Sequence, residues 1–191
     1  MTHKIAILAS GSGSNAENIF NYLSENKPAI EISLIITNNS NAFVLKRAEK
    51  LGIPSIVIPG SLMKDENYVM KVLKEHGIDF IVLAGYLLMV PEYLIKHYPE
   101  KIVNIHPALL PKFGGKGMYG DNVHKAVVEA GEKESGITIH YVNEKYDDGE
   151  TIFQAKCEVL PTDTYEDVAS KVHALEYANF PRVIVETILK N

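Results

Sequence analysis

Short apolar runs alternate with helical stretches through the first hundred residues, and this alternation constrains the fold more than any other feature of the sequence. The runs have the length and the β-branched content of buried strands: Ile5–Ala9, Ile32–Ile36, Ser55–Ile58, Phe80–Ala84 and Ile102–Ile105. Helical stretches lie between them: Ala16–Leu23, Ala42–Leu51, Asp65–His76 and a short helix from Pro91. The alternation predicts a mostly parallel sheet with helices on both faces, whose ligands bind at the carboxyl ends of the strands.

The pattern changes after Pro107, where a glycine-rich loop precedes a helix near Asn122–Ala130. Two antiparallel strands are expected at Thr138–Val142 and Thr151–Val159, and a long final helix after Thr164. That helix is expected to break or bend at Pro181, because proline lacks a backbone N–H. We therefore expect a Rossmann-like α/β fold in one domain over residues 1–191, with a nucleotide-binding-like half over about 1–106 and an extension over about 107–191.

Composition excludes several classes of protein. The 191 residues carry a net charge of -5 and only two arginines, which argues against a nucleic-acid surface. A single cysteine, Cys157, excludes an intrachain disulfide and a thiolate zinc site, and we expect it to be a buried, inert thiol and expect no metal. No apolar run approaches the roughly 20 residues that span a bilayer, and no signal peptide begins the chain. We expect a cytoplasmic protein without membrane contact.

A glycine loop, Gly11–Ala16, follows the first strand and begins the first helix. Backbone N–H groups at a helix N-terminus bind anions, and glycine lets a phosphate approach closely. The loop also fits a relaxed dinucleotide fingerprint, but the second strand ends in Ile36–Asn39 without the acid that holds a ribose. We therefore predict a phosphate monoester site at Gly13, Ser14 and Asn15, the alternative being a tight turn that merely needs glycine.

Asn104 and His106 end the fifth strand, two residues apart and immediately before Pro107. Alternation along a strand places both side chains on one face, where they can converge on a single atom. An amide and a protonated imidazole suit a carbonyl oxygen that becomes negative during attack. For His106 alone, a core histidine is the better interpretation; the pair favours function.

A histidine that works protonated needs a carboxylate nearby to raise its pKa. The turn Tyr146–Gly149, between two expected strands, offers Asp147 and Asp148. Spacing alone does not choose between them, and Asp and Gly are also common in turns without any function.

Four segments, in this order, resemble folate-dependent formyltransferases: Gly11–Asn15, Ala84–Tyr86, Asn104–Pro111 and Tyr146–Gly149. The resemblance covers effectively the whole chain, and the segment Asn-x-His-Pro-x-Leu-Leu-Pro is diagnostic of the superfamily. Within it, the chain is most similar to members of de novo purine biosynthesis that formylate the amine of glycinamide ribonucleotide. The resemblance implies 10-formyltetrahydrofolate as co-substrate, small-molecule partners and no metal.

The same resemblance implies roles for individual residues. It assigns the substrate phosphate to the glycine loop, the formyl carbonyl to Asn104 and His106, and selects Asp147 as the carboxylate that raises the pKa of His106. Glu176, with His173 beside it, would bind the substrate amine. His140 recurs near the pocket, with strand packing an equal alternative. The folate pocket would be formed largely by backbone groups of Leu87, Leu88, Met89, Val90, Asn104, Asn143, Glu144, Lys145, Tyr146 and Asp147.

Two departures from the family stand out. Leu88 and Asp65 occupy positions where basic residues are common, and the loop Phe113–Gly120 is unusually glycine-rich, which favours a mobile lid over a merely solvated loop.

The rival activities are a formyltetrahydrofolate deformylase, for whose usual N-terminal domain we expect no room, a methionyl-tRNA formyltransferase, a nucleotide-binding module and an NAD-dependent dehydrogenase. The sequence leaves a monomer and a homodimer equally open.

Overall fold

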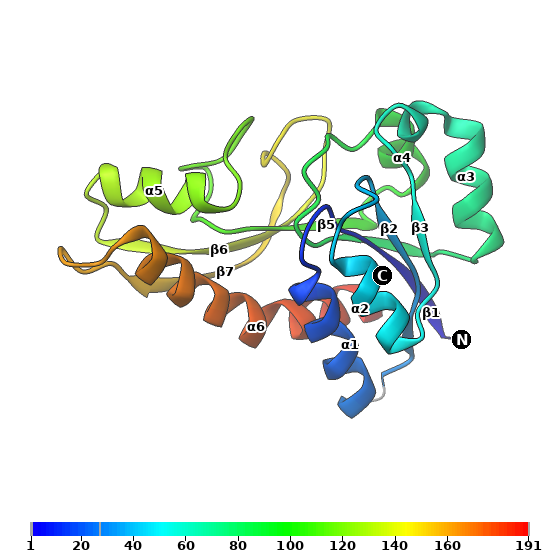
Figure 1. Cartoon of the computed structure of the whole chain (residues 1–191), viewed down its shortest axis with the longest axis horizontal. Helices are drawn as coiled ribbons and strands as arrows, with labels where there is room; N and C mark the ends of the chain where they lie inside the picture. Colours follow the sequence, from blue (N-terminus) through cyan, green and yellow to red (C-terminus); the bar gives the residue numbers. More distant parts are fainter. Residues whose placement is uncertain (1, 27, 191) are drawn as a thin grey trace.

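Seven strands form one mixed sheet in the order β3-β2-β1-β4-β5-β6-β7 (Figure 1). The structure is a computed structural model that describes residues 2–26 and 28–190. β1 to β5 pair in parallel, whereas β6 is antiparallel to β5 and β7 to β6. The strands are β1 His3–Leu8, β2 Ile30–Thr37, β3 Ser55–Val57, β4 Phe80–Leu83, β5 Ile102–His106, β6 Glu134–Tyr141 and β7 Thr151–Glu158. The expected Rossmann-like, mostly parallel sheet with antiparallel C-terminal strands is confirmed.

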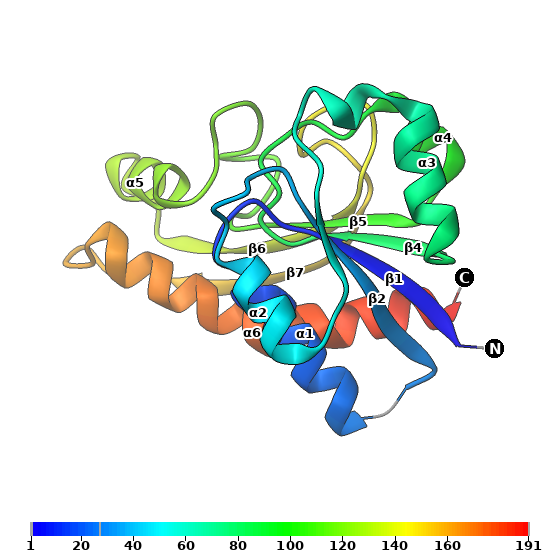
Figure 2. The same ribbon diagram turned by 45° about the vertical axis from the view of Figure 1, so that its right-hand side comes forward.

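Helices cover both faces of the sheet (Figures 1 and 2), and successive residues of β1 face opposite sides. Ile5 and Ile7 are fully buried in a core shared with α1, α2 and α6, whereas Ala6 and Leu8 belong to a second core shared with α3 and α4. The helices are α1 Ser14–Asn26, α2 Val44–Leu51, α3 Glu66–Glu75, α4 Glu92–His97, α5 Asp121–Glu129 and α6 Tyr165–Lys190, with a 3-10 turn, η1, at Leu62–Lys64.

The sixth strand begins at Glu134, four residues earlier than the sequence predicts. The added residues include Ser135 and Gly136, which have low strand propensity, so the residue pattern does not reveal a strand at these positions. Gly136 is required there because a Cβ would lie 2.0 Å from the Ala155 carbonyl oxygen on the neighbouring strand. Close packing between β6 and β7, rather than local propensity, extends the strand.

The sequence predicts that the final helix breaks or bends at Pro181, and the structure excludes the break. Helix α6 runs continuously from Tyr165 to Lys190. A proline at position 181 leaves the Tyr177 carbonyl without its usual helical donor, and Asn18 of α1 replaces that donor, with its Nδ2 at 3.0 Å from the oxygen. An interhelical hydrogen bond therefore satisfies the carbonyl that proline exposes.

The carboxyl ends of β1, β2 and β4 are tied together by Ser10. Its N–H donates to Gly85 O at 2.9 Å and its hydroxyl donates to Asn38 Oδ1 at 2.5 Å, while Leu87 N donates to the hydroxyl at 2.9 Å. The loops that follow these strands are thereby held at one edge of the sheet. In the described ranges, no helix is both long and apolar enough to cross a lipid bilayer.

Candidate active site

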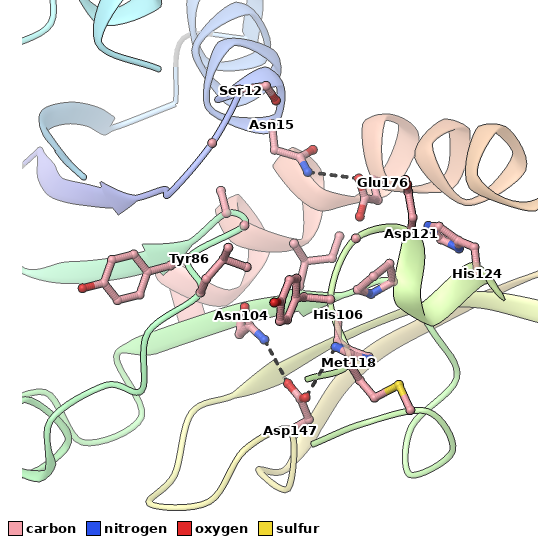
Figure 3. A pocket seen from close by; sticks show the side chains of 18 of the residues that line it. Ser12, Asn15, Tyr86, Asn104, His106, Met118, Asp121, His124, Asp147 and Glu176 are labelled. Carbon is pink, nitrogen blue, oxygen red and sulfur yellow. Dashed lines mark hydrogen bonds and ion pairs between the residues drawn. The ribbon is translucent and has the colours of Figure 1, made fainter. Parts of the chain in front are cut away.

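A cavity of about 630 Å³ opens at this edge of the sheet (Figure 3). Figure 3 shows Asn15 and Glu176 at one end and Asn104 and Asp147 at the other. The glycine loop, the ends of β4 and β5, the loop 115–121, the turn after β6 and helix α6 all contribute to it. The sequence-predicted residues that line it are Gly13, Ser14, Asn15, Leu87, Asn104, His106, Tyr146, Asp147, His173 and Glu176.

The glycine loop lies at the N-terminus of α1, and its conformation depends on Gly13. This residue has φ of 73°, in the left-handed region, and a Cβ at this position would lie 2.4 Å from Val44 Cγ2. Only glycine satisfies both constraints. Asn38, near the place where a dinucleotide site would carry its ribose-binding acid, instead accepts the Ser10 hydrogen bond.

Asn104 is oriented by the strand that pairs with it. β5 and β6 place Asn104 directly opposite His140, and Asn104 Nδ2 lies 3.1 Å from His140 Nε2. His140 Nδ1 lies 2.8 Å from the Tyr141 carbonyl, so it carries the ring proton and Nε2 accepts from the amide. Burial lowers the pKa of His140, which keeps the ring neutral and able to accept. Its buried ring thus positions the Asn104 amide.

His106 is almost fully buried at the end of β5 and both of its ring nitrogens face acceptors. Nδ1 lies 3.5 Å from Asp147 Oδ2, and Nε2 donates to the Phe113 carbonyl at 2.8 Å. A ring with a proton on each nitrogen satisfies both contacts. The arrangement therefore suits an imidazole that works as a cation.

The structure distinguishes the two aspartates that spacing could not. Asp147 is largely buried and reaches Asn104, His106 and the Gly115 N–H, which donates to Oδ2 at 2.9 Å. Asp148 is exposed and pairs with Lys145 Nζ at 3.6 Å. Asp147 also has φ of 53°, a conformation that few non-glycine residues adopt outside functional sites. Of these two aspartates, Asp147 lines the cavity and Asp148 does not.

Glu176 lies at the other end of the cavity, with 6% of its surface exposed. Its Oε2 accepts from Asn15 Nδ2 at 3.1 Å and lies 3.0 Å from His173 Nδ1. The hydrogen bond to Glu176 raises the pKa of His173. The predicted phosphate loop and the predicted amine site are therefore joined through Asn15.

The predicted folate segments are only partly on the cavity wall. Leu87, Tyr146 and Asp147 line it, whereas Leu88, Met89, Val90 and Asn143, Glu144 and Lys145 do not. Val90 is buried in the core beneath α3 and α4, with Leu88 packed against that core. Asp65, at the other position where the family often has a basic residue, caps α3 by accepting from Tyr68 N at 3.1 Å. A structural role thus accounts for Asp65.

His124 is one of the cavity residues that sequence reasoning missed. It is 2% exposed on α5 and lines the cavity, and its Nδ1 has no hydrogen-bond partner within the described ranges. Burial, with a further contribution from His173, lowers the pKa of His124. Helical period marks it as one of several inward positions on α5, so nothing in the sequence distinguishes it from a core residue.

The glycine-rich loop contributes Gly115 to Gly120 to the cavity wall. Its Phe113 carbonyl contacts His106 and its Gly115 N–H contacts Asp147, so the loop holds both ends of that pair.

Cys157 lies far from these residues in the sheet, half-buried on β7, and burial raises the pKa of its thiol. Within residues 2–26 and 28–190, no cluster of three or more His, Cys, Asp or Glu could hold a metal ion.

Fold and cavity together define a class: α/β proteins with a glycine loop before a helix at one end of a cleft and, at the other, an amide and an imidazole that both contact a largely buried carboxylate. A family model described as formyl transferase matches residues 3–184. The chain belongs to this formyl transferase family, and the resemblance seen in its motifs is confirmed.

Individual relatives agree with that membership. A chloroplastic phosphoribosylglycinamide formyltransferase of Arabidopsis thaliana is 40% identical over 95% of this chain, which spans 64% of that relative's length. The solved structure of phosphoribosylglycinamide formyltransferase from Anaplasma phagocytophilum is 36% identical, with a TM-score of 0.86 over 97% of this chain and 86% of the other. Glycinamide ribonucleotide transformylase 1 from Geobacillus kaustophilus is 31% identical, with a TM-score of 0.88, and covers 97% and 98% of the two chains.

Proposed function

We propose that this chain is a phosphoribosylglycinamide formyltransferase, a single-domain enzyme that transfers the formyl group of 10-formyltetrahydrofolate to the amine of glycinamide ribonucleotide. One observation carries the proposal: a single cavity holds a phosphate-type loop and a buried carboxylate at one end and the Asn104, His106 and Asp147 cluster at the other. The names of the relatives support the same reaction. A nucleotide-binding module would have no use for the second cluster.

The substrate occupies the Asn15 end of the cavity. Its phosphate accepts hydrogen bonds from backbone N–H groups of the glycine loop and from Ser14 and Asn15. The carboxylate of Glu176 accepts from the glycinamide amine and directs it toward Asn104 and His106. These contacts place the nucleophile beside the formyl group, so that attack is effectively intramolecular.

The reaction is a direct transfer without an acyl-enzyme. The amine nitrogen attacks the formyl carbon and the C=O π electrons move to the oxygen, which Asn104 Nδ2 and protonated His106 stabilise. The bond from that carbon to N10 of the folate then breaks as the C=O reforms. N10 receives a proton and the amine loses one, relayed through water held by Asp147. His106 Nε2 donates to Phe113 O in the free protein, and when the formyl donor binds this hydrogen bond is redirected to the formyl oxygen while the proton stays on the ring.

The folate end of the cavity has an apolar rim. Leu87 and Tyr146, which line the cavity, are 48% and 42% exposed. Large exposed apolar side chains gathered at a cleft are typical of a surface that covers a planar ligand. Backbone groups of the segments 87–90 and 143–147 supply the polar contacts of the pteridine.

Incubation with a 10-formylfolate, with and without glycinamide ribonucleotide, tests the function. Release of the deformylated folate that depends on the amine substrate, together with formylated product in a 1:1 ratio, is expected. Release without the amine would instead indicate a hydrolase, and no release with either mixture would leave a binding protein. A His106→Ala variant distinguishes enzymatic from spontaneous loss of the formyl group.

A further inference from the structure

The second helix, α2, holds the glycine loop although it does not line the cavity. Arg47 Nε donates to the Ser12 carbonyl at 2.9 Å, and Val44 N donates to the Gly11 carbonyl at 3.1 Å. Two successive carbonyls of the loop are therefore anchored from the same helix. Their position on the α2 side fixes the orientation of the two peptide planes that follow.

In a trans peptide, the N–H points away from the carbonyl of the same unit. The peptide bonds that follow Gly11 and Ser12 are trans, since the only cis bond in the described part of the chain is Leu110–Pro111. Because α2 holds the carbonyls of Gly11 and Ser12, the N–H groups of Ser12 and Gly13 point away from α2. These two N–H groups have no acceptor among residues 2–26 and 28–190. They lie where the loop lines the cavity.

Arg47 is itself held in place by three contacts. Its Nη1 forms an ion pair with Glu17 of α1, the guanidinium lies 5.1 Å from the centre of the Phe43 ring, and Nε reaches the loop. Only 24% of its side chain is exposed. One residue thus links α2, α1 and the loop between β1 and α1.

We propose that Arg47 is a positioning residue for phosphate recognition: it acts through the Ser12 carbonyl to aim two backbone N–H groups at the substrate phosphate. This inference rests on the proposed function for the identity of the substrate. Arg47 lies 35 positions from Ser12 in the sequence yet is bonded to it in space, so no local motif indicates this contact.

Arg182, the other arginine of the chain, provides a matched control. It pairs with Glu186 at 2.8 Å and lies 5.4 Å from the centre of the Phe153 ring. Arg182 thus makes the same two kinds of contact as Arg47, an ion pair and a ring contact, but touches no loop of the cavity. A general loss of stability from removing an arginine should appear in both variants. A loss of phosphate recognition should appear only in Arg47→Met.

The test compares glycinamide ribonucleotide with the same substrate lacking its phosphate. For Arg47→Met we expect KM for the ribonucleotide to rise about tenfold, as for loss of a charge-assisted hydrogen bond, with kcat and the KM of the unphosphorylated substrate within twofold. Arg182→Met should change neither KM. Equal changes for both substrates, or a ribonucleotide KM within twofold of wild type, overturn the inference.

Two further measurements keep the test independent of folding and of the reaction. Arg47→Lys retains a cation for Glu17 but lacks the Nε donor, so it should raise the ribonucleotide KM even if Arg47→Met fails to fold. Calorimetric binding of ribose 5-phosphate should weaken in Arg47→Lys and not in Arg182→Lys. If the wild type binds ribose 5-phosphate but transfers no formyl group, the proposed function fails while this inference stands; unchanged binding in Arg47→Lys contradicts the inference alone.

Discussion

In the proposed function, the two ends of the cavity recognise their ligands with different groups. At the phosphate end, the donors are backbone N–H groups whose directions follow from a glycine turn and from helix α2. At the formyl end, the donors are the side chains of Asn104 and His106, each oriented by another side chain or by a backbone carbonyl. The first end depends on backbone geometry held in part by Arg47, 35 positions from Ser12, and the second depends on side chains up to 43 positions apart.

This difference predicts two kinds of failure. A change at the formyl end should remove chemistry and leave binding and folding nearly intact, because each donor acts mainly on charge that develops in the transition state. A change at the phosphate end should distort the backbone, and therefore should alter binding and stability together. Variants at each end test whether the two ends differ in this way.

The largest effect is expected for His106→Ala. Loss of one donor to a developing oxyanion costs about 3 kcal/mol of barrier, so kcat should fall at least about 100-fold with little change in the KM of the ribonucleotide. Steady-state kinetics with both substrates measures this. His97→Ala, an exposed histidine paired with Glu66 on the far side of the sheet, should remain close to wild type. Turnover of His106→Ala within a few fold of wild type would remove His106 from the mechanism.

Asp147→Asn is expected to be the next most severe, with kcat reduced roughly 10- to 100-fold, because the charged partner of His106 is lost while the shape is kept. Asp148→Asn is the matched control, since Asp148 is the adjacent residue and is exposed. It should stay within twofold of wild type. Similar losses in both variants would indicate that the turn as a whole, and not one carboxylate, supports the reaction.

The sequence predicts the two ends unequally. The strands and helices of the α/β sheet and the glycine loop follow from local patterns, because period, β-branched runs and left-handed glycines depend on neighbouring residues. Asn104 and His106 could be paired because alternation along one strand puts them on one face. The choice of Asp147 over Asp148 could not be made from spacing, because it depends on how a loop after β6 folds over β5, and only family resemblance selected it.

Three features lay beyond local pattern altogether. Helix α6 continues through Pro181 because Asn18 of another helix satisfies the Tyr177 carbonyl. His124 enters the cavity because α5 packs against α6, and Arg47 reaches the glycine loop from α2. Each is a contact between elements distant in sequence, and no property of the residue alone indicates it.

At the phosphate end, Gly13→Ala should produce a smaller catalytic effect with a larger structural one. A Cβ meets Val44 and a left-handed φ costs an L-residue roughly 1–2 kcal/mol, so we expect the ribonucleotide KM to rise about tenfold and Tm to fall. Gly131→Ala has a similar φ of 63° with nothing within 4 Å, so it isolates the backbone strain. It should lower Tm less and leave KM unchanged. A lower Tm with normal KM in Gly13→Ala would separate loop geometry from binding.

The smallest expected effects are pKa changes at the Asn15 end of the cavity, where His173, Glu176 and His124 lie close together. Because Glu176 hydrogen-bonds to His173, the pKa of His173 lies above the 6.5 of a free imidazole, whereas burial keeps that of His124 below it. The stabilisation from charged His173 is therefore fully present below pH 6.5 and is lost as pH rises through the raised pKa.

An NMR titration of the histidine rings measures both values. Glu176→Gln should lower the pKa of His173 toward 6.5, because the carboxylate that hydrogen-bonds to the ring and favours its charged form is removed. Glu186→Gln, which removes an exposed carboxylate from the same helix, should leave it unchanged. Gly13, Ser14 and Asn15 carry no titrating group in this range. If ribonucleotide binding depends on pH near the His173 pKa and this dependence disappears in Glu176→Gln, the dependence belongs to the amine site. A dependence that persists in Glu176→Gln would instead reflect ionisation of the substrate phosphate, and the phosphate end would then be the pH-sensitive one.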